Sequence, residues 1–437
     1  MKKFIRIDRK IESFNKKINV EGDKSLSIRW VIISSLSKKK SIAINLLKSE
    51  DVISAVNCIR ALGSKVKFIK NRCEMRGNGL NFNNKKKLTL NAGNSGTLGR
   101  LILGLLINSE KSIKLIGDKS LSKRDFSRVT KPLKRFGVKF KGRKNLPLEM
   151  KGLKDPKAID YFENRGSAQC KTTIMLAALK SDGLTNIKAK KSRNHTELLF
   201  KYLKIPIKVK TSDKRYDFIK IKGIKKIKPL NYKIPGDISS CSFFIVLTLL
   251  AKNSQLMIKN VNINPTRTGI IKILTMMGAQ IKFINIRSYK GEKVSDIFVK
   301  SSKNLKGINC PINYNSNAID EFLVIFLVAA KSKGISYFKD LSELNQKESP
   351  RLVWASKILN LMGIKNLRTK SSIKIFGNPD LKLDKKIVIK NFSKDHRVFM
   401  MSVIAALTFG GKWKIYDLDS IKTSFPKFLQ TLKKIKP

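Results

Sequence analysis

Basic and hydroxyl side chains gather in a few short segments, each placed just before an apolar stretch, with a small number of carboxylates among them. The members are Lys24, Ser25, Arg29, Ser95, Gly96, Thr97, Arg100, Lys123, Arg124, Arg128, Ser167, Gln169, Arg193, Asp320, Glu321, Lys347, Glu348, Arg351, Asp395, His396 and Arg397. Arginine clamps carboxylate or phosphate with two bonds, while lysine acts as a point charge. Such a set suits one or two small, highly charged anions, and the few carboxylates suit general acid or base roles. Taken singly, each Lys or Arg is more often a solvated surface charge, and each Asp before a helix is more often a cap.

These segments recur at a regular spacing. Each has a polar motif followed at once by an apolar, helix-like run, as in "GDKSLSIRWVIISSL" and "NRGSAQCKTTIMLAAL". The reference points are Ser25, Ser95, Ser167, Ser239, Asp320 and His396, and they lie roughly 70–80 residues apart. Six similar units therefore make up the chain.

Alternating apolar stretches between the motifs predict strands, among them "SIKLIG", "GVKFKG", "QLMIKNVNI" and "AQIKFINI". A second, more polar helix recurs before a "MG" or "FG" turn, as in "IIKILTMMGAQIKF". The organisation is α/β or α+β, and six units suggest two lobes of three. The apolar helices should be buried, since they are hydrophobic nearly all round. Their polar N-terminal ends either attract anions through free backbone N–H groups or are ordinary N-caps.

The hexapeptide GDKSLS occurs twice, from Gly22 and from Gly117. The first copy heads an apolar helix, whereas the second follows a strand and precedes a more exposed helix. The two copies do not share a phase in the repeat, so each needs its own explanation.

The composition limits the class of protein. A length of 437 residues with 42% hydrophobic residues indicates a globular chain, and the formal net charge of +61 is spread along it. Either a base composition that favours Lys, Asn and Ile codons or an anionic partner would produce that charge. Five dispersed cysteines and two histidines predict no disulfide framework and no metal site. The longest apolar runs reach about half the ~20 residues that span a bilayer, and no signal peptide is evident. We expect a soluble, cytoplasmic protein.

The motifs, taken in order, resemble those of the 5-enolpyruvylshikimate-3-phosphate synthase family. The strings "GDKSLSIR", "NAGNSGT", "SLSKR", "SAQ", "PGDISS", "IDE", "DHR" and "TSFP" follow one another from about Gly22 to Phe425. The resemblance implies a two-lobed inside-out α/β barrel of six βαβαββ repeats, three per lobe. One lobe would span residues 21–235 and the other residues 1–20 plus 236–437, with the active site in the cleft between them and no cofactor.

The resemblance also implies a reaction and the residues that perform it. Phosphoenolpyruvate would give its enolpyruvyl group to the 5-hydroxyl of shikimate 3-phosphate, releasing phosphate. The residues that would hold shikimate 3-phosphate are Lys24, Ser25, Arg29, Ser167, Ala168, Gln169, Arg193, Asp320 and Lys347. Those that would hold phosphoenolpyruvate are Lys24, Gly96, Arg124, Gln169, Arg351 and Arg397. Asp320 would be the base for the 5-hydroxyl, Glu348 and Lys24 would transfer protons, and His396 would orient its neighbours. Glyphosate should compete with phosphoenolpyruvate, and we expect a monomer.

Several positions depart from the family pattern. They are Glu21 for Pro, Ile28 for a polar residue, Asp125–Phe126 for Pro-Met, Asn194 for Asp, Pro350 for Asp and Thr423 for a C-terminal lysine, with Lys422 one residue earlier. The competing hypotheses are the sister transferase that acts on UDP-N-acetylglucosamine, an inactive paralogue, and a nucleic-acid-binding protein. The first uses a loop cysteine that "GDKSLSKRD" lacks. The last would need aromatic residues on a basic strand face, whereas most phenylalanines lie in apolar runs.

Overall fold

The chain forms two compact units. The computed structural model describes residues 3–81, 87–211 and 215–435. Unit 1 comprises Met1–Glu21, Pro235–Ser288 and Lys293–Pro437, and unit 2 comprises Gly22–Ile234 together with Tyr289–Glu292. The chain therefore changes unit after Glu21 and after Ile234. The short segment Tyr289–Glu292 is a further excursion, which the sequence does not predict.

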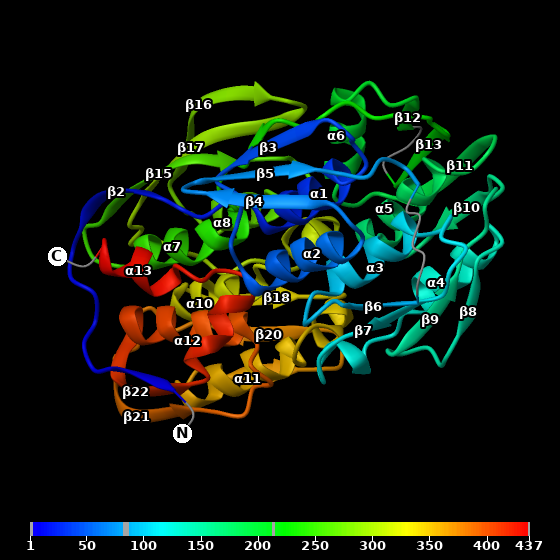
Figure 1. The fold of residues 1–437 in the computed structure, drawn as a ribbon. Helices are drawn as coiled ribbons and strands as arrows, with labels where there is room; N and C mark the ends of the chain where they lie inside the picture. The colour runs from blue at the N-terminus through cyan, green and yellow to red at the C-terminus, as the bar shows by residue number, and fades with distance from the viewer. Residues whose placement is uncertain (1–2, 82–86, 212–214, 436–437) are drawn as a thin grey trace. The chain divides into compact units, whose positions relative to one another are not determined.

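Unit 2 contains three four-stranded sheets in its described part, with the orders β14-β3-β5-β4, β6-β7-β9-β8 and β10-β11-β13-β12 (Figure 1). Each sheet has one parallel pair at an edge and two antiparallel pairings beside it. Their strands are β3 (Lys40–Ile44), β4 (Lys65–Ile69), β5 (Arg72–Arg76), β6 (Leu88–Asn91), β7 (Ile113–Ile116), β8 (Lys139–Lys141), β9 (Leu148–Lys151), β10 (Asp160–Glu163), β11 (Leu184–Lys190), β12 (Ile207–Thr211), β13 (Tyr216–Lys222) and β14 (Tyr232–Lys233). Strand β14 returns to the first sheet, which closes unit 2 at its last residues.

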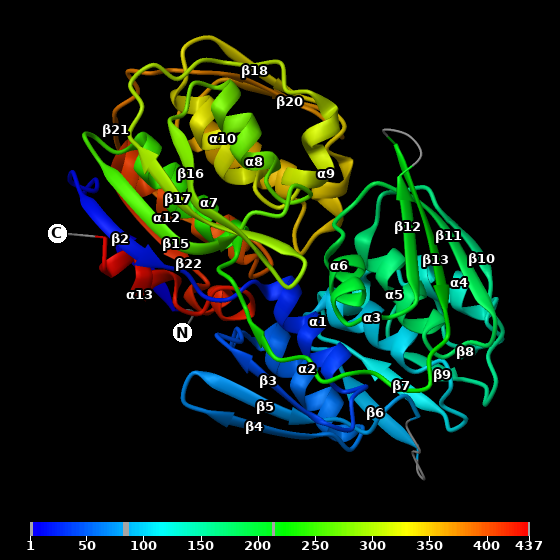
Figure 2. The ribbon, with the colours of Figure 1, turned by 90° about the horizontal axis from the view of Figure 1, so that it is seen from above.

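Unit 1 contains sheets with the orders β16-β17-β15-β2, β18-β20-β19 and β1-β22-β21 (Figure 2). Their strands are β1 (Phe4–Ile7), β2 (Asn15–Asn19), β15 (Gln255–Asn262), β16 (Ile281–Tyr289), β17 (Glu292–Lys300), β18 (Ile335–Phe338), β19 (Asn366–Arg368), β20 (Ile373–Phe376), β21 (Leu383–Ile389) and β22 (Gly410–Tyr416). The N-terminal strands β1 and β2 pair with β22 and β15, so the start of the chain joins sheets built much later.

Six apolar helices form the interior of the two units, three in each. They are α1 (Lys24–Ser34), α3 (Gly96–Leu105), α5 (Ala168–Ala178), α7 (Ile238–Leu250), α10 (Phe322–Lys331) and α12 (His396–Phe409). Nearly all of their residues are buried, as the absence of a polar stripe predicts. The side chains of Asp23, Ser95, Ser167, Asp237 and Asp395 cap five of them by accepting a backbone N–H. The polar motifs therefore stand at the starts of buried helices, as predicted.

A second group of helices flanks the interior. It consists of α2 (Glu50–Ala61), α4 (Ser127–Lys134), α6 (His195–Tyr202), α8 (Gly269–Met276), α9 (Asn315–Ala318), α11 (Arg351–Leu361) and α13 (Phe428–Lys433). Buried apolar side chains form one cluster within each unit, so each unit has a core of its own. In the described part of the chain, none of the helices has both the length and the apolar character that a bilayer crossing requires.

Candidate active site

The first turn of α1 presents Lys24 and Ser25. Asp23 accepts a hydrogen bond from Leu26 N at 2.8 Å, which fixes the helix start and leaves the next two side chains at its open end. Lys24 Nζ lies 3.1 Å from Asp51 Oδ2, and both side chains are mostly buried. Sequence reasoning missed Asp51, although the acidic pair Glu50–Asp51 at the start of an amphipathic run was a signal for it.

Arg29 lies one turn further along α1 and is almost fully buried. Its Nε donates to Thr196 Oγ1 at 2.9 Å and its Nη2 donates to Thr172 Oγ1 at 3.3 Å. The two threonine hydroxyls also contact each other at 2.8 Å. The arrangement joins α1, α5 and α6 around one guanidinium. Sequence reasoning missed both threonines, because the contacts span more than 140 residues.

The start of α5 carries Ser167, Ala168 and Gln169, all half-buried. The Gln169 amide accepts from Arg100 Nη1 at 2.9 Å and donates to Thr97 Oγ1 at 3.0 Å. Burial lowers the pKa of Arg100 to about 10, so it remains a cation at neutral pH. Gln169 is a predicted substrate contact, and two residues of α3, Thr97 and Arg100, hold its amide in position.

Gly96 is the first residue of α3 and is buried. A Cβ placed there would lie 2.8 Å from Arg124 Nη1 and 2.9 Å from Arg100 Nη1. The missing side chain thus lets two guanidiniums approach the backbone at a helix N-terminus. Arg124 also donates to Asn94 Oδ1 at 3.5 Å. Arg193 is half-buried just before α6, within the same unit.

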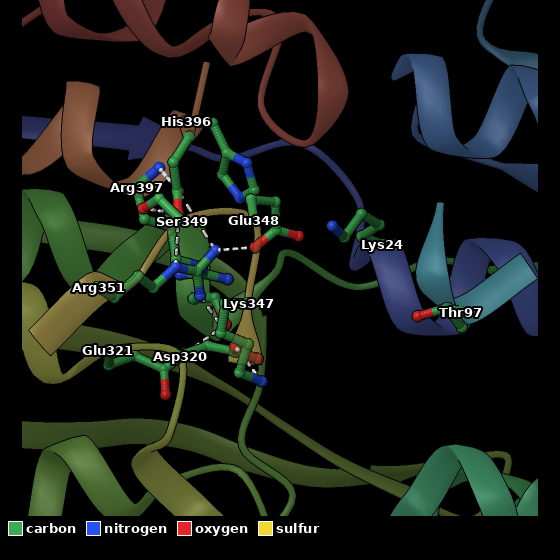
Figure 3. Close-up of polar contacts among 12 residues, drawn as sticks. Lys24, Thr97, Asp320, Glu321, Lys347, Glu348, Ser349, Arg351, His396 and Arg397 are labelled. Atoms are coloured by element: carbon green, nitrogen blue, oxygen red, sulfur yellow. Dashed lines mark hydrogen bonds and ion pairs between the residues drawn. The ribbon is translucent and has the colours of Figure 1, made fainter. Parts of the chain in front are cut away.

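Unit 1 brings together a second set around Arg351, the first residue of α11 (Figure 3). The buried guanidinium donates to Asp395 through Nε at 2.9 Å and Nη2 at 3.3 Å. It also donates to Glu348 Oε2 at 2.5 Å and to Asp320 Oδ1 at 3.4 Å. Lys347 Nζ lies 3.3 Å from the same Asp320 oxygen. The structure therefore gathers the predicted base, proton-transfer residue and two cations in one cluster.

The charge state of this cluster follows from its contacts. Burial by itself lowers the pKa of Arg351, but Asp395, Glu348 and Asp320 outweigh burial and raise that pKa above its ordinary value.

Pro350 immediately precedes α11 with a φ of −69°. That angle is the ordinary one for proline, and the first amide of a helix needs no partner within the helix. Pro350 is thus compatible with the loop that carries Glu348 and Arg351.

The start of α12 supplies His396 and Arg397. His396 Nδ1 lies 3.2 Å from Thr423 Oγ1, so the threonine found in place of a lysine contacts this ring. Lys422 instead pairs with the exposed Asp419 at 2.8 Å. Arg397 is 7% exposed, and its buried Nη1 has no hydrogen-bond partner among the described residues. A buried guanidinium N–H of this kind is suited to an incoming anion.

A buried network joins Arg267, which sequence reasoning missed, to the "PGDISS" and "IDE" motifs. Arg267 Nη2 donates to Ser239 Oγ at 2.8 Å and contacts Asp237 Oδ1 at 3.2 Å. Ser239 in turn donates to Glu321. Glu321 is buried and is the residue before α10, whose first residue is Phe322.

The predicted residues thus form two sets. Unit 2 holds Lys24, Ser25, Arg29, Gly96, Arg124, Ser167, Ala168, Gln169 and Arg193, and unit 1 holds Asp320, Lys347, Glu348, Arg351 and Arg397. Both are rich in cations at helix starts and can bind anions, and the unit 1 set adds carboxylates for proton transfer. Within the described ranges, no three His, Cys, Asp or Glu side chains gather as metal ligands would.

Comparison with known proteins identifies what the chain resembles. Residues 9–432 match the family model described as EPSP synthase (3-phosphoshikimate 1-carboxyvinyltransferase). A protein of Petrotoga mobilis named 3-phosphoshikimate 1-carboxyvinyltransferase is 37% identical over 431 residues, which is 97% of this chain and 98% of that protein.

Solved structures agree with the sequence match. An EPSP synthase from Acinetobacter baumannii superposes with a TM-score of 0.86 at 31% identity, covering 100% of this chain and 98% of the other. The enolpyruvyl transferase NikO from Streptomyces tendae shares the fold with a TM-score of 0.75 at 13% identity, covering 99% and 97%. The predicted fold class, that of the inside-out α/β barrel transferases, is confirmed.

Proposed function

This chain belongs to the EPSP synthase (3-phosphoshikimate 1-carboxyvinyltransferase) family, and from that premise we propose which residues perform its reaction. The enzyme transfers the enolpyruvyl group of phosphoenolpyruvate to the 5-hydroxyl of shikimate 3-phosphate and releases phosphate. The two residue sets act on this one pair of substrates, because each substrate is assigned contacts from both sets, and of the assigned residues only those of unit 1 include the carboxylates for proton transfer.

Shikimate 3-phosphate is held mainly by unit 2. Ser25 and Ser167 lie at the starts of buried helices, where free N–H groups favour phosphate. Arg29 and Arg193 supply charge, and Gln169 supplies an oriented amide. Lys347 and Asp320 of unit 1 complete the substrate's contacts, as the residue-by-residue match to the family implies.

Phosphoenolpyruvate is held by Lys24, Arg124, Gln169 and the backbone at Gly96, together with Arg351 and Arg397. The observation that carries this assignment is the buried Nη1 of Arg397, which has no partner among the described residues. Arg351 is already bonded to three carboxylates. An anion that enters here therefore competes with Glu348 and Asp320 for Arg351 and meets Arg397 without a competitor.

The chemistry proceeds by addition and elimination. Asp320 takes the proton of the 5-hydroxyl of shikimate 3-phosphate. The hydroxyl oxygen then bonds to C2 of phosphoenolpyruvate, while Glu348 or Lys24 protonates the methylene carbon. The resulting tetrahedral ketal gives a proton of its new methyl group back to Glu348 or Lys24, and the C–O bond to phosphate breaks as the double bond re-forms. The cations around the site stabilise the charge that develops on the phosphate.

Phosphate release from the purified protein tests the proposal. Release should need both substrates together. Asp320→Ala should lower kcat by about 10²–10⁴-fold, the usual contribution of a general base, and Lys24→Met should lower it as well. Lys40→Met and Asp155→Ala are the controls, because Lys40 is the exposed partner of an ion pair, Asp155 is an exposed carboxylate, and both lie outside these motifs. Full release by Asp320→Ala, or equal losses in the controls, would contradict the assignment.

A second candidate function, nonspecific binding of single-stranded nucleic acid, is favoured by one observation. On the outer face of the β10-β11-β13-β12 sheet, Lys188 Nζ lies 5.3 Å, 5.1 Å and 5.7 Å from the ring centres of Phe162, Tyr216 and Phe218. Phe162 and Phe218 are 49% and 38% exposed, so this face is an exception to the expectation that phenylalanines lie in apolar runs. Oligonucleotide binding that survives physiological salt and is lost in Phe162→Ala/Phe218→Ala would support it.

Cytoplasmic location and a monomeric state remain predictions.

A further inference from the structure

The turn between β16 and β17 reaches into unit 2 and packs against α6. Tyr289 Oη accepts a hydrogen bond from Lys233 N at 2.8 Å, and its ring centre lies 5.3 Å from that of Tyr232. Lys290 and Gly291 both have positive φ, 48° and 88°, which is the backbone of a two-residue type I′ hairpin. A Cβ on Gly291 would lie 3.0 Å from Leu198 O of α6. The turn is therefore closely fitted to this helix.

Glu292 ends the turn and contacts the first residue of α6. Its Oε1 lies 2.6 Å from His195 Nδ1, and both side chains are fully buried. The carboxylate is thus placed at the N-terminal end of α6, where the helix dipole favours negative charge. The Asn194 side chain, which precedes α6, makes no N-cap hydrogen bond to the helix.

The first turn of α6 also supports the Arg29 side chain. Thr196, next to His195, accepts from Arg29 Nε at 2.9 Å, and Arg193 stands two residues before His195. We propose that Glu292 is a positioning residue for the shikimate 3-phosphate subsite, because it fixes the start of α6 and through it Arg193 and the Thr196–Arg29 pair. This inference rests on the proposed assignment of Arg29 and Arg193 to that substrate.

Steady-state kinetics of Glu292 variants test the inference. Glu292→Ala should raise KM for shikimate 3-phosphate by about 10-fold or more, while KM for phosphoenolpyruvate changes by less than about 2-fold, since a misplaced guanidinium weakens only its own substrate. Glu292→Gln retains an oxygen that accepts from Nδ1–H and should return KM for shikimate 3-phosphate to within about 3-fold of the wild type.

Tyr289→Phe is the matched control. It removes the hydroxyl that holds the same turn but leaves the His195 contact in place. It should lower Tm without changing KM for shikimate 3-phosphate by more than about 2-fold. The inference is overturned if Tyr289→Phe reproduces the KM effect, if both KM values rise together, or if Glu292→Ala leaves both unchanged.

A double-variant comparison and a calorimetric binding measurement complete the test of Glu292. If Glu292→Ala does not fold, the double variant Glu292→Gln/His195→Gln, compared with each single variant, should show non-additive increases in KM for shikimate 3-phosphate, and additive ones would overturn the inference. Calorimetric binding of shikimate 3-phosphate alone separates the two proposals. If the wild type binds it but releases no phosphate, the assigned reaction fails while the Glu292 effect on affinity is still expected. If the wild type does not bind it, the assignment of the subsite fails, and Glu292 with it.

Discussion

Arg351 and Asp395 are joined by two hydrogen bonds, Nε to Oδ2 at 2.9 Å and Nη2 to Oδ1 at 3.3 Å. Both side chains are almost completely buried, and Asp395 also caps α12 through Arg397 N at 2.9 Å. One carboxylate therefore sets the orientation of Arg351 and the start of the helix that carries Arg397. The two arginines proposed for phosphoenolpyruvate are positioned by the same residue.

Asp395→Asn should disturb both arginines at once. The amide keeps an oxygen for the helix cap but loses the charge and one of the two acceptors for Arg351. We expect kcat/KM for phosphoenolpyruvate to fall by about 10–100-fold, because misplacement of about 1 Å is costly in an oriented site. Stability should fall by about 3 kcal/mol, as when a buried ion pair loses one partner. Ser349→Ala, which removes a 2.9 Å bond to Asp395 and leaves the pair, should change the kinetics by less than about 3-fold. Equal kinetic losses in the two variants would contradict this role.

Gly96→Ala should weaken phosphoenolpyruvate binding without unfolding the protein. The new methyl group would approach only the ends of the Arg124 and Arg100 side chains, which can move, and alanine favours a helix over glycine by up to about 1 kcal/mol. The displaced guanidiniums should raise KM for phosphoenolpyruvate by about 10-fold and weaken inhibition by glyphosate. KM for shikimate 3-phosphate should rise less than KM for phosphoenolpyruvate, because among the contacts assigned to shikimate 3-phosphate the displaced arginines hold only Gln169. An unchanged KM for phosphoenolpyruvate would show that the arginines do not need this approach.

Replacing both members of the buried pair Lys171–Glu197 should change the stability little, whereas removing only one member should lower it strongly. Lys171 Nζ lies 2.6 Å from Glu197 Oε1, with side chains 0% and 4% exposed. Lys171→Met leaves a buried carboxylate without its cation and should cost about 3–5 kcal/mol, whereas Lys171→Met/Glu197→Leu should recover most of that loss. Urea unfolding of the two variants measures the difference, and a double variant less stable than the single one would refute the expectation.

Glu21, which stands where the family usually has proline, should make stability depend on pH. Burial raises the pKa of Glu21, although its bond from Lys427 N at 2.8 Å opposes the shift. The folded state therefore binds this proton more tightly than the unfolded state, so stability from this group is present at acid pH and is lost as pH rises through the folded pKa. Glu21→Gln keeps the acceptor without the charge and should raise Tm at pH 7 but not at pH 4. Glu12→Gln, at an exposed position, should show no such difference, and an equal gain at both pH values for Glu21→Gln would exclude the mechanism.

The sequence predicted the helix starts well because they are local features. An apolar run preceded by Ser167 or Asp395 specifies a buried helix and its cap within a few residues. The strands in "SIKLIG" and "QLMIKNVNI" were confirmed for the same reason. Their partners in the sheets could not be read locally, since β2 pairs with β15 across more than 200 residues.

The supporting residues were missed because their contacts are long-range. Asp51, Thr196 and Glu292 acquire their roles only when the fold brings them to Lys24, Arg29 and His195. Arg100 was noticed as part of a motif, but nothing in the sequence indicates that it holds Gln169.

The chain passes from unit 1 to unit 2 after Glu21 and returns to unit 1 after Ile234. Asp237 N donates to Glu21 O at 3.1 Å, so the points where unit 1 is left and re-entered lie side by side. On the other side, a Cβ on Gly22 would lie 2.9 Å from the Ile234 side chain. Unit 2 thus has the topology of a module inserted between two neighbouring points of unit 1, and a short linker from Glu21 to Pro235 would span the excision. The turn at Tyr289–Glu292, which belongs to unit 2, would then lose its contact with His195.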